Sequence, residues 1–421
     1  MNERCFIEKL RVWLPWSDDI NILFEKTTIA DHVIPNRLVV HPMEAADAEA
    51  STGAPTARTI QRYKKYGNGG SGIIWCEATA ISLTGRSNPY QLVLTDQTLP
   101  AFKTLVNEIR ASAAKCELYH DSLSPLLILQ LTHAGRQSLD FPRITHHSQI
   151  LDPIRKIDRT HPCLTDEELE KIAEDFVHAA VLAREAGFDG VDIKACHGYL
   201  IHETLYSYTR VNSKYGGTFE NRTQLLCDIV SQIKKREPCL LITSRLNFYD
   251  GIPFPWGWGT DENGAPAIGE VVQLISKLYA LGVRLISTAY GNPYYDPTIE
   301  RPSAADDETR ALENVLRMFT IAREIKRHVP HVLFVLTGFS WLRDAWPYVA
   351  AGCIASGFGD YAGLGRGALA NPFFPQELFT SRKLSRVCTA CSSCAQLLRR
   401  GQEVRCVVYQ NQEQKEVKHV H

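Results

Sequence analysis

The chain has 421 residues, of which 44% are hydrophobic and 22% are charged, and its formal net charge is −1. These values are typical of a globular protein with one large domain and an appendage, and the balanced charge disfavours nucleic-acid or anionic-membrane binding. No apolar run is long enough to cross a bilayer, and the charged N-terminus does not resemble a signal peptide. With twelve cysteines and no export signal, we expect thiols in a reducing cytoplasm.

Short runs that are apolar on both faces alternate with amphipathic helical segments along most of the chain. Such runs are typical of parallel strands that helices cover on both sides. The predicted strands are 37–41, 72–77, 126–131, 190–194, 240–246, 284–287, 332–336 and 359–363. Eight strands that alternate with helices predict an α/β fold, a (β/α)8 TIM barrel, rather than a doubly wound sheet.

Two local signals refine this prediction. The clearest helix is 166–186, which Thr165 and Glu168 open with a capping box and Gly187 ends. The segment 67–72 matches the G-x-G-x-x-G pattern of dinucleotide-binding turns, but it follows a helical segment and leads into a strand. We therefore interpret these glycines as a helix stop and a loop.

Reactive side chains in such a barrel follow the C-terminal ends of the strands. The turns after the seventh and eighth predicted strands contain Gly338, Gly365 and Arg366, which suit the usual phosphate pocket of this fold. Gln130 and Arg245 belong to the same mouth and suit the polar edge of a flavin. Together these residues indicate a cradle for FMN, although each one alone is also explained as a satisfied core polar group.

Four cysteines near the C-terminus carry a second signal. Cys388, Cys391 and Cys394 are separated by two-residue gaps, and Cys406 follows after eleven residues. This pattern is typical of a ferredoxin-like [4Fe–4S] cluster. A structural zinc site and free thiols remain as alternatives.

Several stretches resemble the old yellow enzyme, or NADH:flavin oxidoreductase, family, and the cysteines resemble its iron–sulfur branch, which includes 2,4-dienoyl-CoA and 2-enoate reductases. The stretches are 36–43, 53–56, 77–80, 130–136, 187–190, 197–200, 214–217, 220–222 and 365–366, of which Tyr-Gly-Gly followed by Glu-Asn-Arg is the most specific.

The resemblance implies an FMN-binding barrel with a proton donor beside the flavin. The positions that match the family's flavin contacts are Pro42, Met43, Ala78, Gln130, Arg245, Gly338, Gly365 and Arg366. Tyr199 matches the proton donor, and His197 matches a residue that donates to the substrate oxygen. Tyr199 can also be explained as a rim aromatic of the core.

Four features depart from the family. Lys194 replaces a histidine or another residue that grips the substrate carbonyl, and it can polarise that carbonyl, pair with a carboxylate or form a structural ion pair. Glu44 lies beside the flavin where many members have a small residue, and its charge would disfavour an anionic reduced flavin. The gap between Cys391 and Cys394 is one residue shorter than usual, and the chain ends soon after the cysteines.

We therefore expect an N-terminal extension (1–21), an FMN-binding barrel (22–380) and a four-cysteine iron–sulfur segment (381–421). The expected activity is reduction of an activated C=C bond in a small molecule, with electrons from NAD(P)H or from a separate donor protein through the cluster. The alternatives are a dehydrogenase or demethylase that uses the same flavin site oxidatively, an electron carrier without turnover, and a zinc-bearing barrel without flavin. Self-association is left open.

Overall fold

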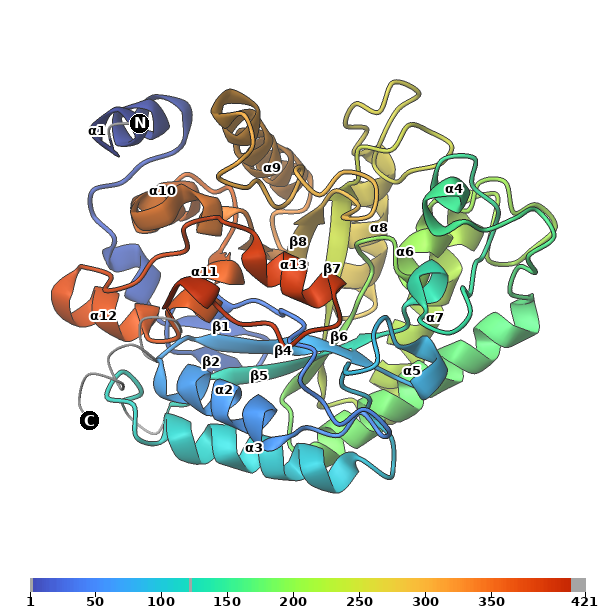
Figure 1. Cartoon of the computed structure of the whole chain (residues 1–421), viewed down its shortest axis with the longest axis horizontal. Helices are drawn as coiled ribbons and strands as arrows, with labels where there is room; N and C mark the ends of the chain where they lie inside the picture. Colours follow the sequence, from blue (N-terminus) through green and yellow to red (C-terminus); the bar gives the residue numbers. More distant parts are fainter. Residues whose placement is uncertain (1–2, 121–122, 410–421) are drawn as a thin grey trace.

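The computed structural model describes residues 3–120 and 123–409. Eight parallel strands close into a barrel in the order β10-β3-β4-β5-β6-β7-β8-β9 (Figure 1). The strands are β3 (Leu38–Val40), β4 (Ile73–Ala80), β5 (Leu126–Thr132), β6 (Gly190–Ile193), β7 (Leu241–Tyr249), β8 (Leu285–Tyr290), β9 (Leu333–Leu336) and β10 (Tyr361–Leu364). Each predicted run overlaps one of these strands, and the predicted (β/α)8 fold is confirmed.

Three strands extend three residues beyond their predicted ends, to Ala80 in β4, Tyr249 in β7 and Tyr290 in β8. The apolar pattern stops earlier because the ends of β4 and β7 include polar residues, yet the backbone ladder continues. The register shifts near the ends of β4 and β7, as in a β-bulge. Ala78 consequently lies within β4 rather than in the loop that follows it, whereas Arg245 lies within β7, inside its predicted run.

Helices surround the barrel, and the chain alternates strand and helix through most of its length (Figure 1). The long helix α5 begins and ends as predicted, because Thr165 and Glu168 form the capping box and Gly187 adopts a left-handed φ of 98°. The glycine segment 67–72 follows α2 and precedes β4, which confirms the helix-stop interpretation. The helices around the barrel are α2 (Ala57–Asn68), α3 (Leu99–Ala113), α4 (Leu151–Arg155), α5 (Asp166–Ala186), α6 (Leu200–Leu205), α7 (Phe219–Arg236), α8 (Gly269–Ala280), α9 (Glu308–His328) and α10 (Trp346–Ala355).

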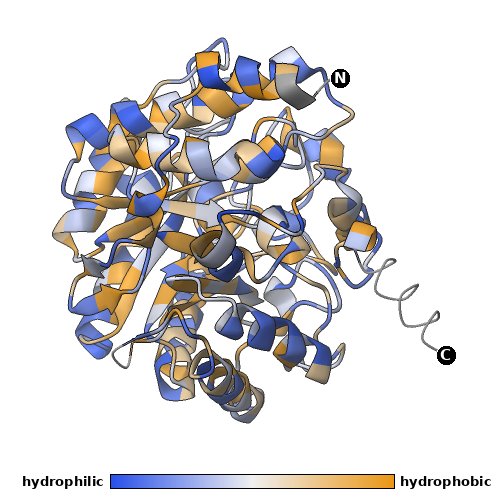
Figure 2. Ribbon diagram, turned by 90° about the vertical axis from the view of Figure 1, so that its left-hand side faces the viewer, coloured by the Kyte–Doolittle hydropathy of each residue, from blue (hydrophilic) through white to orange (hydrophobic). Residues whose placement is uncertain are grey.

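Apolar side chains close the barrel interior at one end. Figure 2 shows hydrophobic residues along the central strands and mixed character on the surrounding helices. Strand residues such as Trp75 and Tyr361 form one buried cluster with Ile29 and Ile34. Ile29 and Ile34 belong to an antiparallel hairpin, β1 (Thr27–Ile29) and β2 (His32–Ile34), that was not predicted. The hairpin covers the N-terminal end of the strands, so the site is sought at the opposite end.

The N-terminal residues pack against the barrel rather than extending from it. Helix α1 (Glu3–Trp13) places Phe6 edge-on against Trp341, with ring centroids 5.5 Å apart. The Trp16 ring stacks on Tyr348 of α10 at 5.1 Å. The extension therefore covers the outer side of the β9–β10 crossover.

The cysteine segment lies over the C-terminal end of the barrel. After α11 (Arg366–Ala370) and α12 (Phe374–Ser381), the chain continues to α13 (Ser393–Arg399). The Ala304 amide in the β8–α9 loop donates to Ala390 O at 2.9 Å, and the Val404 amide donates to Ala45 O at 2.7 Å. These bonds tie the segment to loops that follow β8 and β3. Residues 410–421, the end of the predicted segment, lie outside the described residues.

Among the residues that the structure describes, no helix combines the length and the apolar character that a membrane crossing requires.

Candidate active site at the barrel mouth

A buried carboxylate orients the Gln130 side chain inside the barrel mouth. Gln130 Nε2 donates to Asp192 Oδ2 at 2.6 Å, and Trp75 Nε1 donates to the same oxygen at 2.9 Å. Burial raises the pKa of the Asp192 carboxyl, while the hydrogen bond from Gln130 opposes this shift. The remaining carbonyl and N–H of Gln130 are then held in a fixed direction. Asp192 was not predicted, although an aspartate within the apolar run of β6 was a usable signal.

Glu300, which the sequence analysis also missed, links two predicted site residues. Its Oε1 lies 2.7 Å from Arg245 Nη2, and its Oε2 lies 2.7 Å from His197 Nε2. Burial would raise the pKa of Glu300, but His197 and Arg245 hold it well below its usual value. Burial lowers the pKa of His197 to about 4, although Glu300 opposes this shift. No local pattern singles out Glu300, because both partners are more than 50 residues away along the chain.

Lys194 and Tyr199 are in direct contact after β6. Lys194 Nζ lies 3.6 Å from the centroid of the Tyr199 ring, and the two residues are only 5% and 6% exposed. Within the described chain, no hydrogen bond or salt bridge engages the Lys194 ammonium. Burial lowers the pKa of Lys194, whereas the nearby Cys196 and Glu44 oppose this shift. The structure therefore shows a buried lysine amine that lacks a direct anionic partner.

Tyr199 remains a phenol at ordinary pH. Burial, followed by the neighbouring Tyr294 and Glu44, raises the pKa of Tyr199 well above its usual value. Tyr294 comes from the β8–α9 loop and is 37% exposed, so this loop borders the mouth. A protonated phenol in a buried site can donate a proton to a bound molecule.

Glu44 follows β3 and faces the same group of residues. Ser87 Oγ donates to Glu44 Oε1 at 2.9 Å, and Asn88 Nδ2 donates to the same oxygen. Burial raises the pKa of Glu44, while Lys194 opposes this shift. Glu44 is therefore held by neutral donors, and Lys194 acts on it through space rather than through a salt bridge.

The predicted phosphate turns lie in the adjacent sector of the mouth. Gly338 has a φ of 101°, which favours glycine, and a Cβ there would lie 2.9 Å from Met318 Cε. A Cβ at Gly365 would lie 3.1 Å from Met43, so the ends of β10 and β3 approach closely. Arg366 Nη1 donates to Pro302 O at 2.9 Å. These positions leave little room for larger side chains at either turn.

The residues at the mouth fit a flavin mononucleotide. Arg245 Nε is buried and has no hydrogen-bond partner in the described part of the chain. An unsatisfied guanidinium nitrogen, an oriented carboxamide and close-set glycines are the groups that an anionic, ring-bearing cofactor needs. The mouth also brings Lys194, His197, Tyr199 and Glu44 close together, and the packing of Met43 against Gly365 brings in the end of β3. Pro42 and Ala78 complete the predicted set; Pro42 follows β3, and the Ala78 carbonyl in β4 accepts a hydrogen bond from Gln91 at 3.0 Å.

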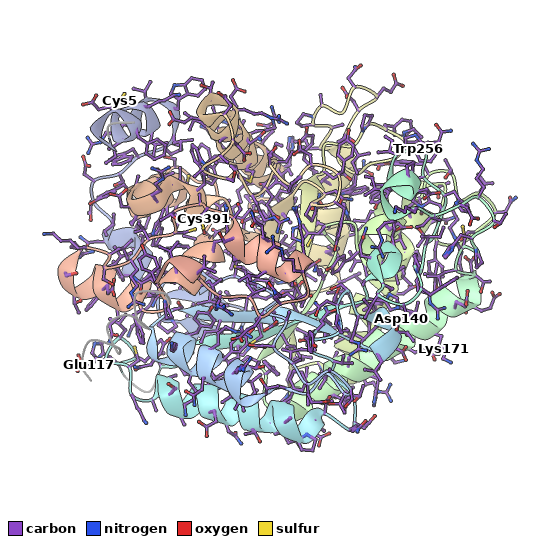
Figure 3. The ribbon with its side chains drawn as sticks, in the orientation of Figure 1. Cys5, Glu117, Asp140, Lys171, Trp256 and Cys391 are labelled. Atoms are coloured by element: carbon purple, nitrogen blue, oxygen red, sulfur yellow. The ribbon has the colours of Figure 1, made fainter. Side chains whose placement is uncertain are left out.

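The four predicted cluster ligands lie within one docked segment, and Figure 3 labels Cys391 beside α13. Burial raises the pKa of Cys388 and Cys394, whereas Arg366 opposes both shifts. Cys406 also acts on Cys388 through space, so these thiols are neighbours. A guanidinium beside two of the four thiols, Cys388 and Cys394, suits an anionic thiolate cluster chemically. However, no three metal-ligating side chains in the described residues are arranged to hold a metal ion, so the cluster stays a prediction.

Comparisons with known proteins agree with this architecture. Over 385 residues, the chain is 29% identical to an NADH oxidase of Thermoanaerobacter brockii, which covers 88% of this chain and 52% of that protein. It is 34% identical over 215 residues to an NADPH dehydrogenase of Listeria monocytogenes serotype 4a (strain HCC23), which covers 51% of this chain and 60% of the relative. The chain thus spans about half the length of the curated relatives it matches.

Solved structures share the fold at low sequence identity. A 2-naphthoyl-CoA reductase in complex with 2-naphthoyl-CoA matches with a TM-score of 0.76 at 21% identity, over 92% of this chain and 57% of that chain. The old yellow enzyme homologue from Zymomonas mobilis matches with a TM-score of 0.63 at 22% identity, over 86% and 94%. The sequence profile of the NADH:flavin oxidoreductase / NADH oxidase family matches residues 22–385. The chain therefore belongs to the NADH:flavin oxidoreductase / NADH oxidase family.

Proposed function

We propose that the chain is an FMN-dependent oxidoreductase that reduces an activated C=C bond in an enone, enoate or enoyl thioester. The observation that carries this proposal is the contact between the Lys194 ammonium and the Tyr199 phenol after β6. A buried cation can hold a carbonyl or carboxylate oxygen, and a buried phenol beside it can deliver a proton. The family match supports flavin as the redox group.

Different residues of the mouth would bind the cofactor, donate the proton and hold the substrate. Bound FMN would supply a hydride to the beta carbon of the substrate. Tyr199 gives its phenolic proton to the alpha carbon, and Lys194 and His197 hold the carbonyl oxygen during the reaction. The residues proposed to hold the cofactor are Pro42, Met43, Glu44, Ala78, Gln130, Arg245, Gly338, Gly365 and Arg366.

We further propose that Cys388, Cys391, Cys394 and Cys406 bind a [4Fe–4S] cluster that relays electrons to the flavin. The backbone bonds from Ala304 and Val404 support this, because they dock the cysteine segment on loops that follow β8 and β3. Arg366 lies in the phosphate turn after β10 and acts on Cys388 and Cys394, so it adjoins both sites. In this proposal residues 22–380 form the flavin unit and 381–421 the cluster unit. The names of the relatives support NAD(P)H as an electron source.

We expect the anaerobically purified protein to be yellow-brown and to contain one FMN per chain together with the four irons of a [4Fe–4S] cluster. Absorption spectra and metal analysis measure both, and iron chelation should bleach the brown component while the flavin spectrum remains. A Cys388→Ser/Cys391→Ser double variant is the matched control, and it should retain FMN without iron. Stoichiometric zinc in yellow protein would contradict the cluster alone, whereas colourless protein would contradict the flavin proposal.

A further inference from the structure

The carboxylate of Glu300 lies between the two predicted groups that define the mouth. It contacts Arg245 Nη2 and His197 Nε2, each at 2.7 Å, with one oxygen for each partner. Glu300 and Arg245 are 8% and 7% exposed, so solvent screens their interaction weakly. A carboxylate in this position offsets the positive charge of Arg245 and favours one of the two ring nitrogens of His197 as the site of the proton.

We propose that Glu300 is a positioning residue that neutralises Arg245 and fixes the proton of His197 on Nε2. The inference rests on the proposed flavin site, because Arg245 is one of the residues expected to contact FMN.

The charge argument begins with the Arg245–Glu300 pair. An arginine beside a flavin favours the anionic reduced form, because opposite charges attract strongly in a buried site. Glu300 supplies the compensating negative charge within hydrogen-bond distance of the same guanidinium. Since the pair is close to neutral, Arg245 stabilises the reduced flavin less than a free arginine would. The flavin potential is then lower and the reduced flavin is a stronger reductant, as a weakly activated C=C bond requires.

The proton argument concerns His197. His197 Nε2 lies 2.7 Å from Glu300 Oε2, although among the described residues it makes no well-aligned hydrogen bond. Because two lone pairs at this distance would repel each other, we place the proton of His197 on Nε2. A positive charge on the ring is disfavoured because the ring is buried and, to a lesser extent, because Arg245 and Lys194 also act on it. His197 is then a neutral imidazole whose Nδ1 is an acceptor. In the free enzyme, Lys194 is therefore the cationic donor of the pair, and the single N–H of His197, on Nε2, is the one that it can offer to a substrate oxygen.

A redox titration of the FMN-loaded protein tests the charge argument. Glu300→Gln keeps the shape and removes the charge, so the flavin midpoint potential should shift to a more positive value. Glu300→Asp should retain most of the wild-type potential. Glu270→Gln is the matched control, because Glu270 pairs with Arg222 at 2.6 Å through α8 and α7, outside the mouth. A Glu300→Gln potential equal to or below the wild-type value would overturn the inference.

Nitrogen-15 NMR of the FMN-free protein tests the proton argument separately, with the His197 signal assigned from its loss in His197→Gln. We expect the Nε2–H tautomer in the wild type and a mixture of tautomers in Glu300→Gln. A wild-type Nδ1–H tautomer, or an imidazolium at neutral pH, would overturn the inference. This measurement needs no flavin, so failure of the proposed flavin site and failure of the Glu300 contact give different results.

Discussion

Replacing Tyr199 by phenylalanine is expected to slow the reoxidation of reduced flavin by an unsaturated substrate by roughly 10²- to 10⁴-fold, the usual cost of losing a general acid. The hydride and the proton go to different carbons, and the buried Tyr199 phenol is the proposed source of the proton. The reduction of the flavin by NAD(P)H or dithionite should keep its rate, because no substrate proton moves in that half-reaction. Rapid-mixing spectroscopy of the two half-reactions separates them.

The pH dependence gives a second expected result for Tyr199. Burial raises the pKa of Tyr199 well above its usual value, so the phenol stays protonated as pH rises through the neutral and mildly alkaline range. Deprotonation of Tyr199 should therefore not reduce the rate of the oxidative half-reaction at any pH below about 10, the ordinary pKa of tyrosine.

The control for this variant is Tyr206→Phe. Tyr206 is fully buried, and its hydroxyl has no hydrogen-bond partner in the part of the chain that the structure describes. Loss of that hydroxyl should leave both half-reactions unchanged. If Tyr199→Phe reoxidises at the wild-type rate, the proton comes from another group or from solvent, and the role proposed for Tyr199 is wrong.

Replacing Lys194 by methionine is expected to weaken the binding of an enoate by roughly 10- to 150-fold, which corresponds to about 1.5–3 kcal/mol for a charge-assisted hydrogen bond. Methionine keeps most of the length and apolar surface of the side chain while it removes the ammonium. The binding of the neutral methyl ester of the same acid should weaken much less, because the ester presents no full charge to Lys194. The test compares how many fold Lys194→Met weakens enoate binding with how many fold it weakens ester binding. Both values come from the dependence of flavin reoxidation on substrate concentration.

The lowered pKa of Lys194 also predicts how enoate binding changes with pH. Burial disfavours the ammonium, so the free enzyme loses this proton at a lower pH than an exposed lysine does. Enoate binding should accordingly weaken as pH rises through that lowered pKa, and Lys194→Met should lack this pH dependence.

An exposed lysine provides the control for Lys194. Lys171 lies on the surface of α5, away from the mouth (Figure 3), and Lys171→Met should bind both substrates as the wild type does. Equal weakening of enoate and ester by Lys194→Met would show that Lys194 acts structurally. An unchanged affinity for both would show that no anion contacts it.

The sequence was sufficient for the barrel because its signals are local. An apolar run that is buried on both faces predicts a parallel strand wherever it occurs, and the Thr165–Glu168 box with Gly187 defines α5 without tertiary information. The hairpin β1–β2 escaped prediction because each of its strands is short and buries only one residue, so neither forms an apolar run. Strand ends were placed too early where polar residues continue the ladder.

The site was less predictable because its charge pairs join distant segments. Lys194, His197 and Tyr199 lie in one short stretch and could be recognised together. Glu300 comes from the β8–α9 loop and becomes a partner of Arg245 and His197 only after the barrel closes. Asp192 likewise orients Gln130 across neighbouring strands. The cysteine spacing predicts a cluster, but in the described residues no three metal-ligating side chains are arranged to hold a metal ion, so the cluster stays a prediction.

The most direct test of the central proposal is anaerobic mixing of dithionite-reduced, FMN-containing protein with matched enone, enoate and enoyl thioester substrates. The proposal predicts that at least one of them reoxidises the flavin and yields the corresponding saturated product, with solvent-derived hydrogen at the alpha carbon. If none of these substrates reoxidises the flavin, while an amine reduces the oxidised protein, C=C reduction is wrong and the site acts as a dehydrogenase.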